Sequence, residues 1–199
     1  MRKTKKVNDP NILVEKQKFY ISEFEQEATW LSFMHREGWK LTSIRGSRYY
    51  FEKTDTEDWI YELDYLDVGT AAGDYLQMYQ DFGWEFVCQY DHWCYFRKQR
   101  IEGEETNTFL FSDCETKIEL CKRIKKNKFS HILSAFLFLP CALHVLYTYS
   151  QKKLFDSILN TGITVFCILF LYILFISLVI YFNQINRLNK KIKELSVKN

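Results

Sequence analysis

Two long apolar segments without a charged side chain occupy the second half of this 199-residue chain, at residues 129–149 and 158–182. An α-helix rises ~1.5 Å per residue and the hydrocarbon core of a bilayer is ~30 Å thick, so about 20 apolar residues reach across it. Helices of globular proteins seldom stay apolar on every face over such a length. The sequence therefore predicts two transmembrane helices that form a hairpin, with a buried core hairpin as the alternative.

Basic residues flank the two segments on one side. Five lysines and arginines precede the first segment and five follow the second, whereas the connection holds only Lys152 and Lys153. Cytoplasmic flanks carry the excess of positive charge. We therefore expect a multi-pass protein of the cell membrane with both termini in the cytoplasm. Six cysteines without the spacing of a disulfide framework fit a reducing compartment.

The charge of the chain changes sign along its length. Residues 15–113 contain 10 Lys and Arg against 20 Asp and Glu, and residues 114–199 contain 13 against 4. An acidic domain repels phosphate groups, so we expect no direct nucleic-acid binding. The predicted organisation is a flexible N-terminus (1–16), an acidic cytosolic domain (17–113), a basic linking helix (114–128), the two spans, and a basic cytosolic tail helix (183–199).

The acidic domain contains an internal repeat. A shift by 45 residues aligns positions 20–53 with 65–98 without a gap and gives seven identities. Each copy reads as a short strand, an amphipathic helix that ends at a glycine, and two strands joined by a turn. We expect the first strand at residues 18–21. The predicted fold class is α+β, built from duplicated β-α-β-β units with a ferredoxin-like topology as one option, and followed by the two-helix transmembrane hairpin.

Six sequence blocks resemble a known family. They are EATWLSFMHREGWKL, RYYFEKT, WIYELDY, DYLQMYQDFGWEFV, WCYFRK and FSDCETKIELCKRI. In this order they are similar to the domain of unknown function 2812, found mainly in Gram-positive bacteria. The resemblance implies a bacterial protein with C-terminal membrane spans that is encoded near a PadR-type transcriptional regulator. It transfers no catalytic residue.

Residues able to support catalysis or metal binding are scattered. His92 and Cys94 supply two ligands where a zinc site needs three or four, and His35 is expected at the surface near a helix end. The sequence holds no phosphate-binding glycine loop and no nucleophile motif. We therefore predict no catalytic, cofactor or metal site and no enzyme activity, with an enzyme acting on lipid at the bilayer surface as the alternative.

Acidic residues on one strand are the first candidates for an interaction. Glu62 and Asp64 alternate with aromatic residues, so we expect them on the solvent face, and Asp67 follows them. Such a face would attract a basic partner by electrostatic steering, unless it only aids solubility.

Two further groups of residues are candidates for contacts between helices. Apolar residues at a spacing of 3–4 follow the second span and would pair either with the linking helix or with a second chain, as a homodimer: Ile185, Leu188, Ile192 and Leu195. Polar residues inside the first span would form interhelical hydrogen bonds or a functional site: His131, Cys141 and His144.

Together these features predict a membrane-anchored regulatory or sensory module that faces the cytosol. Its partners would be the lipid bilayer and a protein of basic character, such as the PadR-type regulator that the resemblance implies. The alternative is an accessory subunit of a membrane transporter or envelope-assembly complex.

Overall fold

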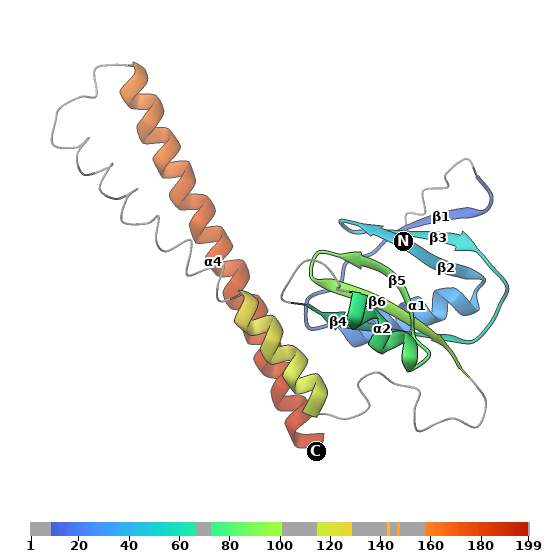
Figure 1. Ribbon diagram of the computed structural model, residues 1–199. Coiled ribbons are helices and arrows are strands. Elements are labelled where there is room, and N and C mark those ends of the chain that lie inside the picture. Colours follow the sequence, from blue (N-terminus) through green and yellow to red (C-terminus); the bar gives the residue numbers. More distant parts are fainter. Residues whose placement is uncertain are drawn as a thin grey trace. The chain divides into compact units, whose positions relative to one another are not determined.

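The computed structural model describes residues 9–66, 73–100, 115–128, 143, 147 and 158–198. They belong to two compact units. The first comprises Met1–Arg123 together with Lys191–Asn199, and the second comprises Ile124–Lys190. Figure 1 shows the order of the elements along the chain.

The first unit contains two copies of a β-α-β-β arrangement, so the α+β class is confirmed. The first copy consists of β1 (Ile12–Lys16), α1 (Phe24–Arg36), β2 (Trp39–Arg45) and β3 (Arg48–Lys53). The second consists of β4 (Trp59–Tyr65), α2 (Gly73–Asp81), β5 (Glu85–Tyr90) and β6 (Trp93–Gln99). Each copy forms its own three-stranded antiparallel sheet, in the orders β1-β3-β2 and β4-β6-β5. The structure thus has two sheets instead of the single sheet of a ferredoxin-like topology. The repeat pattern could not distinguish the two, because it does not determine which strands pair.

The two copies also share their irregularities. A β-bulge interrupts the pairing of β2 with β3 and recurs 45 residues later between β5 and β6. Residues with positive φ recur at the same spacing: Gly38 (84°) and Gly83 (78°), then Gly46 (62°) and Asp91 (55°). Such details are not needed for burying apolar area, so they support the duplication that the sequence predicts.

The first strand lies earlier than we expected. β1 pairs with β3 from Ile12 to Lys16, inside the segment 1–16 that we predicted to be a flexible terminus. Residues 18–21 are outside any strand. Phe19 gives that segment its strand-like pattern, but its ring packs against Trp30 (5.6 Å between centroids) and Tyr49 (6.3 Å).

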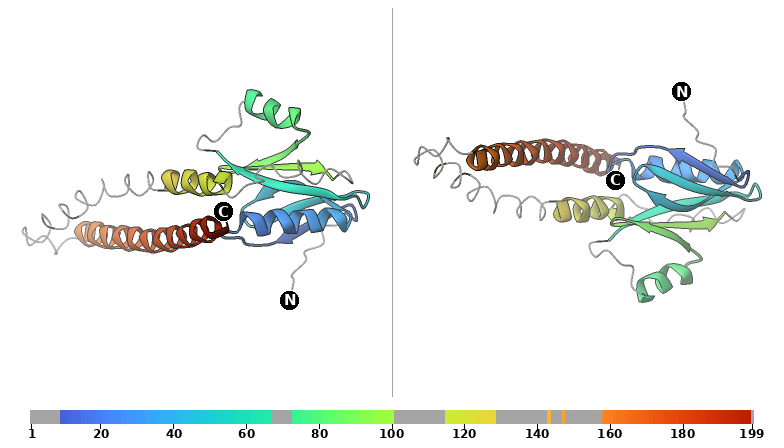
Figure 2. Two further views of the ribbon diagram at one scale, coloured as in Figure 1. Left: turned by 90° about the horizontal axis from the view of Figure 1, so that it is seen from below. Right: turned by 90° about the horizontal axis from the view of Figure 1, so that it is seen from above.

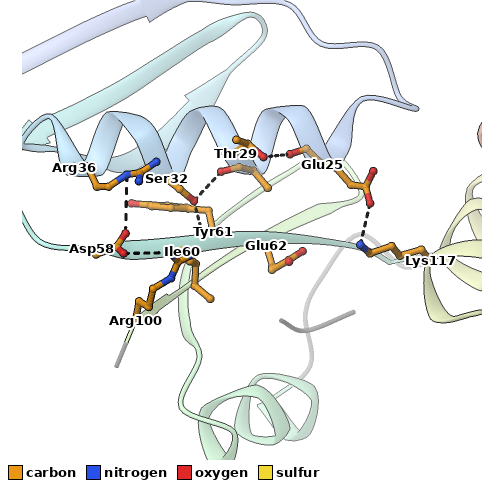
Figure 3. A pocket seen from close by; sticks show the side chains of 11 residues that line it. Glu25, Thr29, Ser32, Arg36, Asp58, Ile60, Tyr61, Glu62, Arg100 and Lys117 are labelled. Atoms are coloured by element: carbon orange, nitrogen blue, oxygen red, sulfur yellow. Dashed lines mark hydrogen bonds and ion pairs between the residues drawn. The ribbon is translucent and has the colours of Figure 1, made fainter. Parts of the chain in front are cut away.

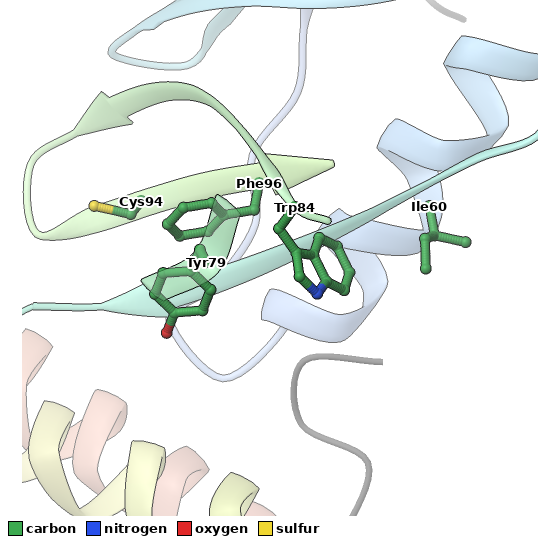
Figure 4. Close-up of a cluster of buried hydrophobic side chains, with 5 residues drawn as sticks. All are labelled: Ile60, Tyr79, Trp84, Cys94 and Phe96. Atoms are coloured by element: carbon green, nitrogen blue, oxygen red, sulfur yellow. The ribbon is translucent and has the colours of Figure 1, made fainter. Parts of the chain in front are cut away.

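α1 contacts both sheets, whereas α2 contacts one. Trp30 on α1 packs edge-on against Tyr49 of β3, with 5.0 Å between ring centroids. On another side of α1, Phe24 stacks on Trp93 of β6 at 5.9 Å. α2 covers the opposite face of the β4-β6-β5 sheet (Figure 2). A buried cluster forms there (Figure 4): Ile60, Tyr79, Trp84, Cys94 and Phe96.

The helix α4 (Ile158–Lys198) is the membrane candidate. Its part from Ile168 to Val197 is the one helix within the described ranges that is long and apolar enough to cross a bilayer, since an 18-residue window in it has a mean hydropathy of 2.2. Large apolar side chains on it are exposed, such as Phe166 (69%) and Phe175 (64%). The predicted first span, 129–149, lies outside the described residues except for Leu143 and Tyr147, so the hairpin itself is not shown.

Candidate functional site

A polar pocket of about 350 Å³ runs along the outer edge of β4 (Figure 3). β4 is the first strand of its sheet, so one of its edges has no neighbouring strand. α1 forms one wall, and β4 contributes side chains from both of its faces. We call this site the β4-edge pocket. Its uncharged lining residues are Ala28, Thr29, Ser32, Ile60 and Tyr61.

The small polar side chains of the pocket are satisfied by internal hydrogen bonds. The Ser32 hydroxyl accepts a hydrogen bond from the Tyr61 amide (2.9 Å) and donates one to the Ala28 carbonyl (3.0 Å). The Thr29 hydroxyl donates to the Glu25 carbonyl (2.8 Å). The groups available to bind a ligand are therefore mainly the charged residues at the two ends of the pocket.

One end of the pocket carries an excess of positive charge. Asp58 pairs with Arg100 at 3.4 Å and more loosely with Arg36 at 4.0 Å. All three side chains are between 41% and 52% exposed. Two guanidinium groups thus share one carboxylate at the rim of the site.

The other end is formed by Glu25, Lys117 and Glu62 (Figure 3). Glu25 pairs with Lys117 at 3.0 Å and also with Lys191. Burial alone would raise the pKa of Glu25, but the hydrogen bonds from Lys191 and Lys117 outweigh it and lower this pKa below its ordinary value. The carboxylate is therefore held in its charged form.

Glu62 differs from the other acidic residues of the pocket. Within the part of the chain that the structure describes, its half-buried carboxylate makes no hydrogen bond or ion pair. Burial raises the pKa of Glu62 to about 7, because the effect of Lys117, which lowers it, is smaller and Glu25 raises it further. A carboxyl group in a pocket whose pKa is shifted strongly by burial is a feature typical of functional sites.

A second polar site lies further along β4, on the face of the strand that α2 covers. Asp64 is 2% exposed. Its carboxylate accepts hydrogen bonds from the hydroxyls of Tyr75 and Tyr79 on α2, both at 2.8 Å. It also forms an ion pair with Arg123, which lies on the helix at residues 115–128, at 2.7 Å. We call these four residues the Asp64 junction, because they tie β4 to α2 and to the linking helix.

Sequence reasoning missed a buried carboxyl group on α1. The Oε1 atom of Glu27 accepts hydrogen bonds from Tyr49 of β3 (2.7 Å) and from Tyr95 of β6 (2.8 Å), so it joins the two sheets. Burial raises the pKa of Glu27, and the two hydrogen bonds offset part of this rise. The signal was present, because position 27 falls on the apolar face of α1 between Phe24 and Leu31.

The structure changes the interpretation of the acidic strand residues. Glu62 lines the β4-edge pocket, but Asp64 is buried in the junction and is not on a solvent face. The strand is covered on both faces, so alternation with aromatic residues did not identify an exposed side. Asp67 lies outside the described residues, as do His131, Cys141 and His144.

The apolar seam after the predicted second span is the less exposed face of α4. Leu188 (0%) and Leu195 (5%) are buried, and Ile185 and Ile192 are half-buried. Within the second unit, Lys125 of the linking helix donates a hydrogen bond to Asn189 of α4 at 3.1 Å. The linking helix and α4 thus lie side by side at this point, as the intramolecular alternative requires.

The two histidines that the structure describes, His35 and His92, pack against neighbouring residues of the fold. His35 is 2% exposed rather than on the surface, because it stacks on Trp59 (5.4 Å between centroids) and shares a hydrogen bond with the Tyr61 hydroxyl (3.0 Å). Burial lowers the pKa of His35 to about 4. His92 lies 2.8 Å from the Leu66 carbonyl oxygen. Among the described residues, no group of three or more His, Cys, Asp or Glu side chains could hold a metal ion.

A family model described as protein of unknown function (DUF2812) matches residues 23–133. The matched region begins at the start of α1 and includes the β4-edge pocket and all residues of the Asp64 junction. Comparisons with curated proteins and with solved structures each gave no match.

Proposed function

The chain belongs to the DUF2812 family of proteins of unknown function, and we propose that it is a membrane-anchored regulatory or sensory module. In this proposal its anchor is a hairpin of two spans, 129–149 and 158–182, with both termini in the cytoplasm. The exposed apolar side chains of α4 and the basic residues that flank both segments support this arrangement. The duplicated acidic region then faces the cytosol and binds a protein partner.

The observation that carries the proposal is the ion pair between Asp64 and Arg123. Arg123 lies on the linking helix, whose sequence continues into the predicted first span. Withdrawing Arg123 would leave the buried Asp64 carboxylate without its cation. We expect this to cost about 2–3 kcal/mol, less than for a fully buried pair, because Arg123 is partly exposed. A shift of the linking helix is therefore coupled to the packing of α2.

A second tie joins both membrane-side connections to α1. Lys117 precedes the first predicted span in sequence, and Lys191 follows the second. Both pair with the same carboxylate, that of Glu25. A change in the separation of these two connections would therefore act on α1 through one side chain.

Hydrogen exchange of the full chain in liposomes tests this coupling. We expect a change of acyl-chain length to alter amide exchange in β4 and α2, because the Asp64 junction transmits a shift of the linking helix. Arg123→Gln should abolish the response. Lys122→Gln, at the exposed neighbouring position, should keep it. If amide exchange in α2 of the wild-type protein does not change with acyl-chain length, the proposal is contradicted.

The partner is tested by crosslinking in native membranes followed by mass spectrometry. We propose a cytosolic protein with a basic surface, and a DNA-binding regulator of the PadR type is our first candidate. Its capture should weaken as salt screens the acidic face. Recovery of a polytopic membrane protein instead would favour an accessory subunit of a transporter or envelope-assembly complex.

A further inference from the structure

We propose that the β4-edge pocket binds a small zwitterion, with its ammonium group at Glu62 and its anionic group at Arg36 and Arg100. No such site follows from the proposed coupling through the Asp64 junction, whose four residues do not line the pocket, so a failure of one proposal can be distinguished from a failure of the other. The volume of about 350 Å³ is at the lower end of the range for ligand pockets, and it suits a molecule the size of a short peptide.

Glu62 selects for a positive group. Its carboxylate is half-buried and has no hydrogen bond or ion pair in the described chain, while Lys117, the nearest cation of the pocket, is already paired with Glu25. Burying a charged group without a partner is unfavourable. An ammonium group from a ligand would supply the missing partner without breaking an existing pair.

The opposite end selects for a negative group. Arg36 and Arg100 share the single carboxylate of Asp58, at 4.0 Å and 3.4 Å. Guanidinium groups bind carboxylates and phosphates through paired N–H donors. The loose geometry and partial exposure of the two arginines leave donors available to an anion at the rim.

The spacing of the two ends sets the length of the ligand. Asp58 and Glu62 are four residues apart along an extended segment, which corresponds to about 13 Å between their Cα atoms. Because the arginine side chains reach toward Asp58, the ligand itself spans less. An extended tripeptide, with its free amino and carboxyl termini, spans about 10 Å.

Triglycine is therefore the probe, titrated into the isotope-labelled full chain in detergent micelles and followed by amide chemical shifts. We expect shifts at β4 and α1 and a dissociation constant on the order of 1 mM, as for other ligands of this size. N-acetylation of triglycine removes its ammonium group, and C-terminal amidation removes its carboxylate. Each modification should weaken binding by about tenfold, the effect of losing one charge-assisted hydrogen bond.

Two variants test which end of the pocket binds each charged group of triglycine. Glu62→Gln should weaken triglycine binding and no longer distinguish triglycine from its acetylated form. Arg100→Gln should no longer distinguish triglycine from its amide. Glu37→Gln, an exposed residue of the same region that does not line the pocket, should bind as the wild type does.

The proposal is overturned if neither triglycine nor tetraglycine shifts the β4 amides, or if Glu62→Gln binds triglycine unchanged. The bilayer-dependent hydrogen exchange described above is measured without peptide. A failure of that experiment therefore leaves the ligand site untouched, and the reverse also holds.

Discussion

The two copies of the repeat have the same local structure but very different burial. They share strand order, the β-bulge and the positive-φ positions, yet α1 buries six of its 13 residues and α2 buries one of its nine. α1 packs between two sheets, whereas α2 lies on one sheet. The comparison shows that local sequence sets the elements of each copy, and that their position in the assembled unit sets how firmly each helix is held.

The less buried copy is also the one tied to the linking helix, through the pair of Asp64 with Arg123. Met78 on α2 (46%) and Phe82 directly after it (68%) are exposed, and α2 is held partly through the hydrogen bonds of Tyr75 and Tyr79 to Asp64. A helix with few buried contacts opens at a low free-energy cost. The second copy is therefore the better candidate for a responsive element, and the first copy for a fixed support.

Matched leucine truncations should show the largest difference between the copies. Leu31 and Leu76 are equivalent in the repeat, but Leu31 is fully buried and Leu76 only partly. We expect Leu31→Ala to lower the free energy of unfolding by about 3–4 kcal/mol and Leu76→Ala by about 1 kcal/mol. Chemical denaturation of the two variants measures this. Equal losses would mean that α1 and α2 are held alike.

Replacement of Glu27 should have the next largest effect. Glu27→Leu leaves two buried tyrosine hydroxyls without an acceptor, at a cost of about 3 kcal/mol. Glu27→Gln keeps an oxygen at the same place and should cost less than half of that. If both variants unfold at the same denaturant concentration, the hydrogen bonds from Tyr49 and Tyr95 do not contribute to holding the sheets together.

His35 should make the first copy sensitive to acid. Its pKa is lowered to about 4 by burial, so between about pH 6.5 and pH 4 the unfolded chain binds a proton that the native protein excludes. Stability therefore falls as the pH falls through this window, by about 2–3 kcal/mol. His35→Gln, which places there the residue found at equivalent position Gln80, should remove this loss.

Glu62 changes the dependence of stability on pH in the opposite direction. With its pKa raised to about 7, the native protein binds more protons than the unfolded chain between about pH 4.5 and pH 7, so stability from this group falls as the pH rises. Thermal unfolding of wild type and His35→Gln over the same pH series separates the two effects. Parallel curves would rule out the contribution of His35.

Glycine substitutions should give the smallest difference. Gly38 and Gly83 both have positive φ, which disfavours any other residue. A Cβ atom at Gly38 would lie 3.2 Å from the Thr54 carbonyl oxygen, but at Gly83 it would meet only the flexible Lys98 side chain at 3.4 Å. We expect Gly83→Ala to cost about 1 kcal/mol and Gly38→Ala about 1 kcal/mol more, measured by urea titration. A larger loss of unfolding free energy for Gly83→Ala than for Gly38→Ala would contradict this prediction.

Periodicity and repetition predicted the elements of this protein but not their assembly. The amphipathic pattern predicted for the first helix is confirmed, since its apolar residues Phe24, Ala28, Leu31 and Met34 are all buried. The shift of 45 residues identified both copies. Neither signal says which side of β4 faces water, because a strand between two helices is buried on both faces. Asp64 was misplaced for this reason, and His35 was misplaced because its packing on Trp59 requires contacts between α1 and β4.

The candidate site was accessible to sequence reasoning only in part. Glu62 was singled out as an acidic strand residue, but the pocket's basic residues Arg36, Arg100 and Lys117 come from three separate parts of the chain. Their convergence depends on the packing of α1 beside the edge strand, which no local pattern encodes. The Asp64 junction likewise requires a helix that lies 59 positions further along the chain.

The hydrogen bond from the Tyr61 amide to the Ser32 hydroxyl has a consequence for how copies of this protein coexist. Edge strands invite neighbouring chains to add to them and begin intermolecular sheets. By engaging this donor within the molecule, a single hydroxyl discourages β4 from becoming a seed for aggregation.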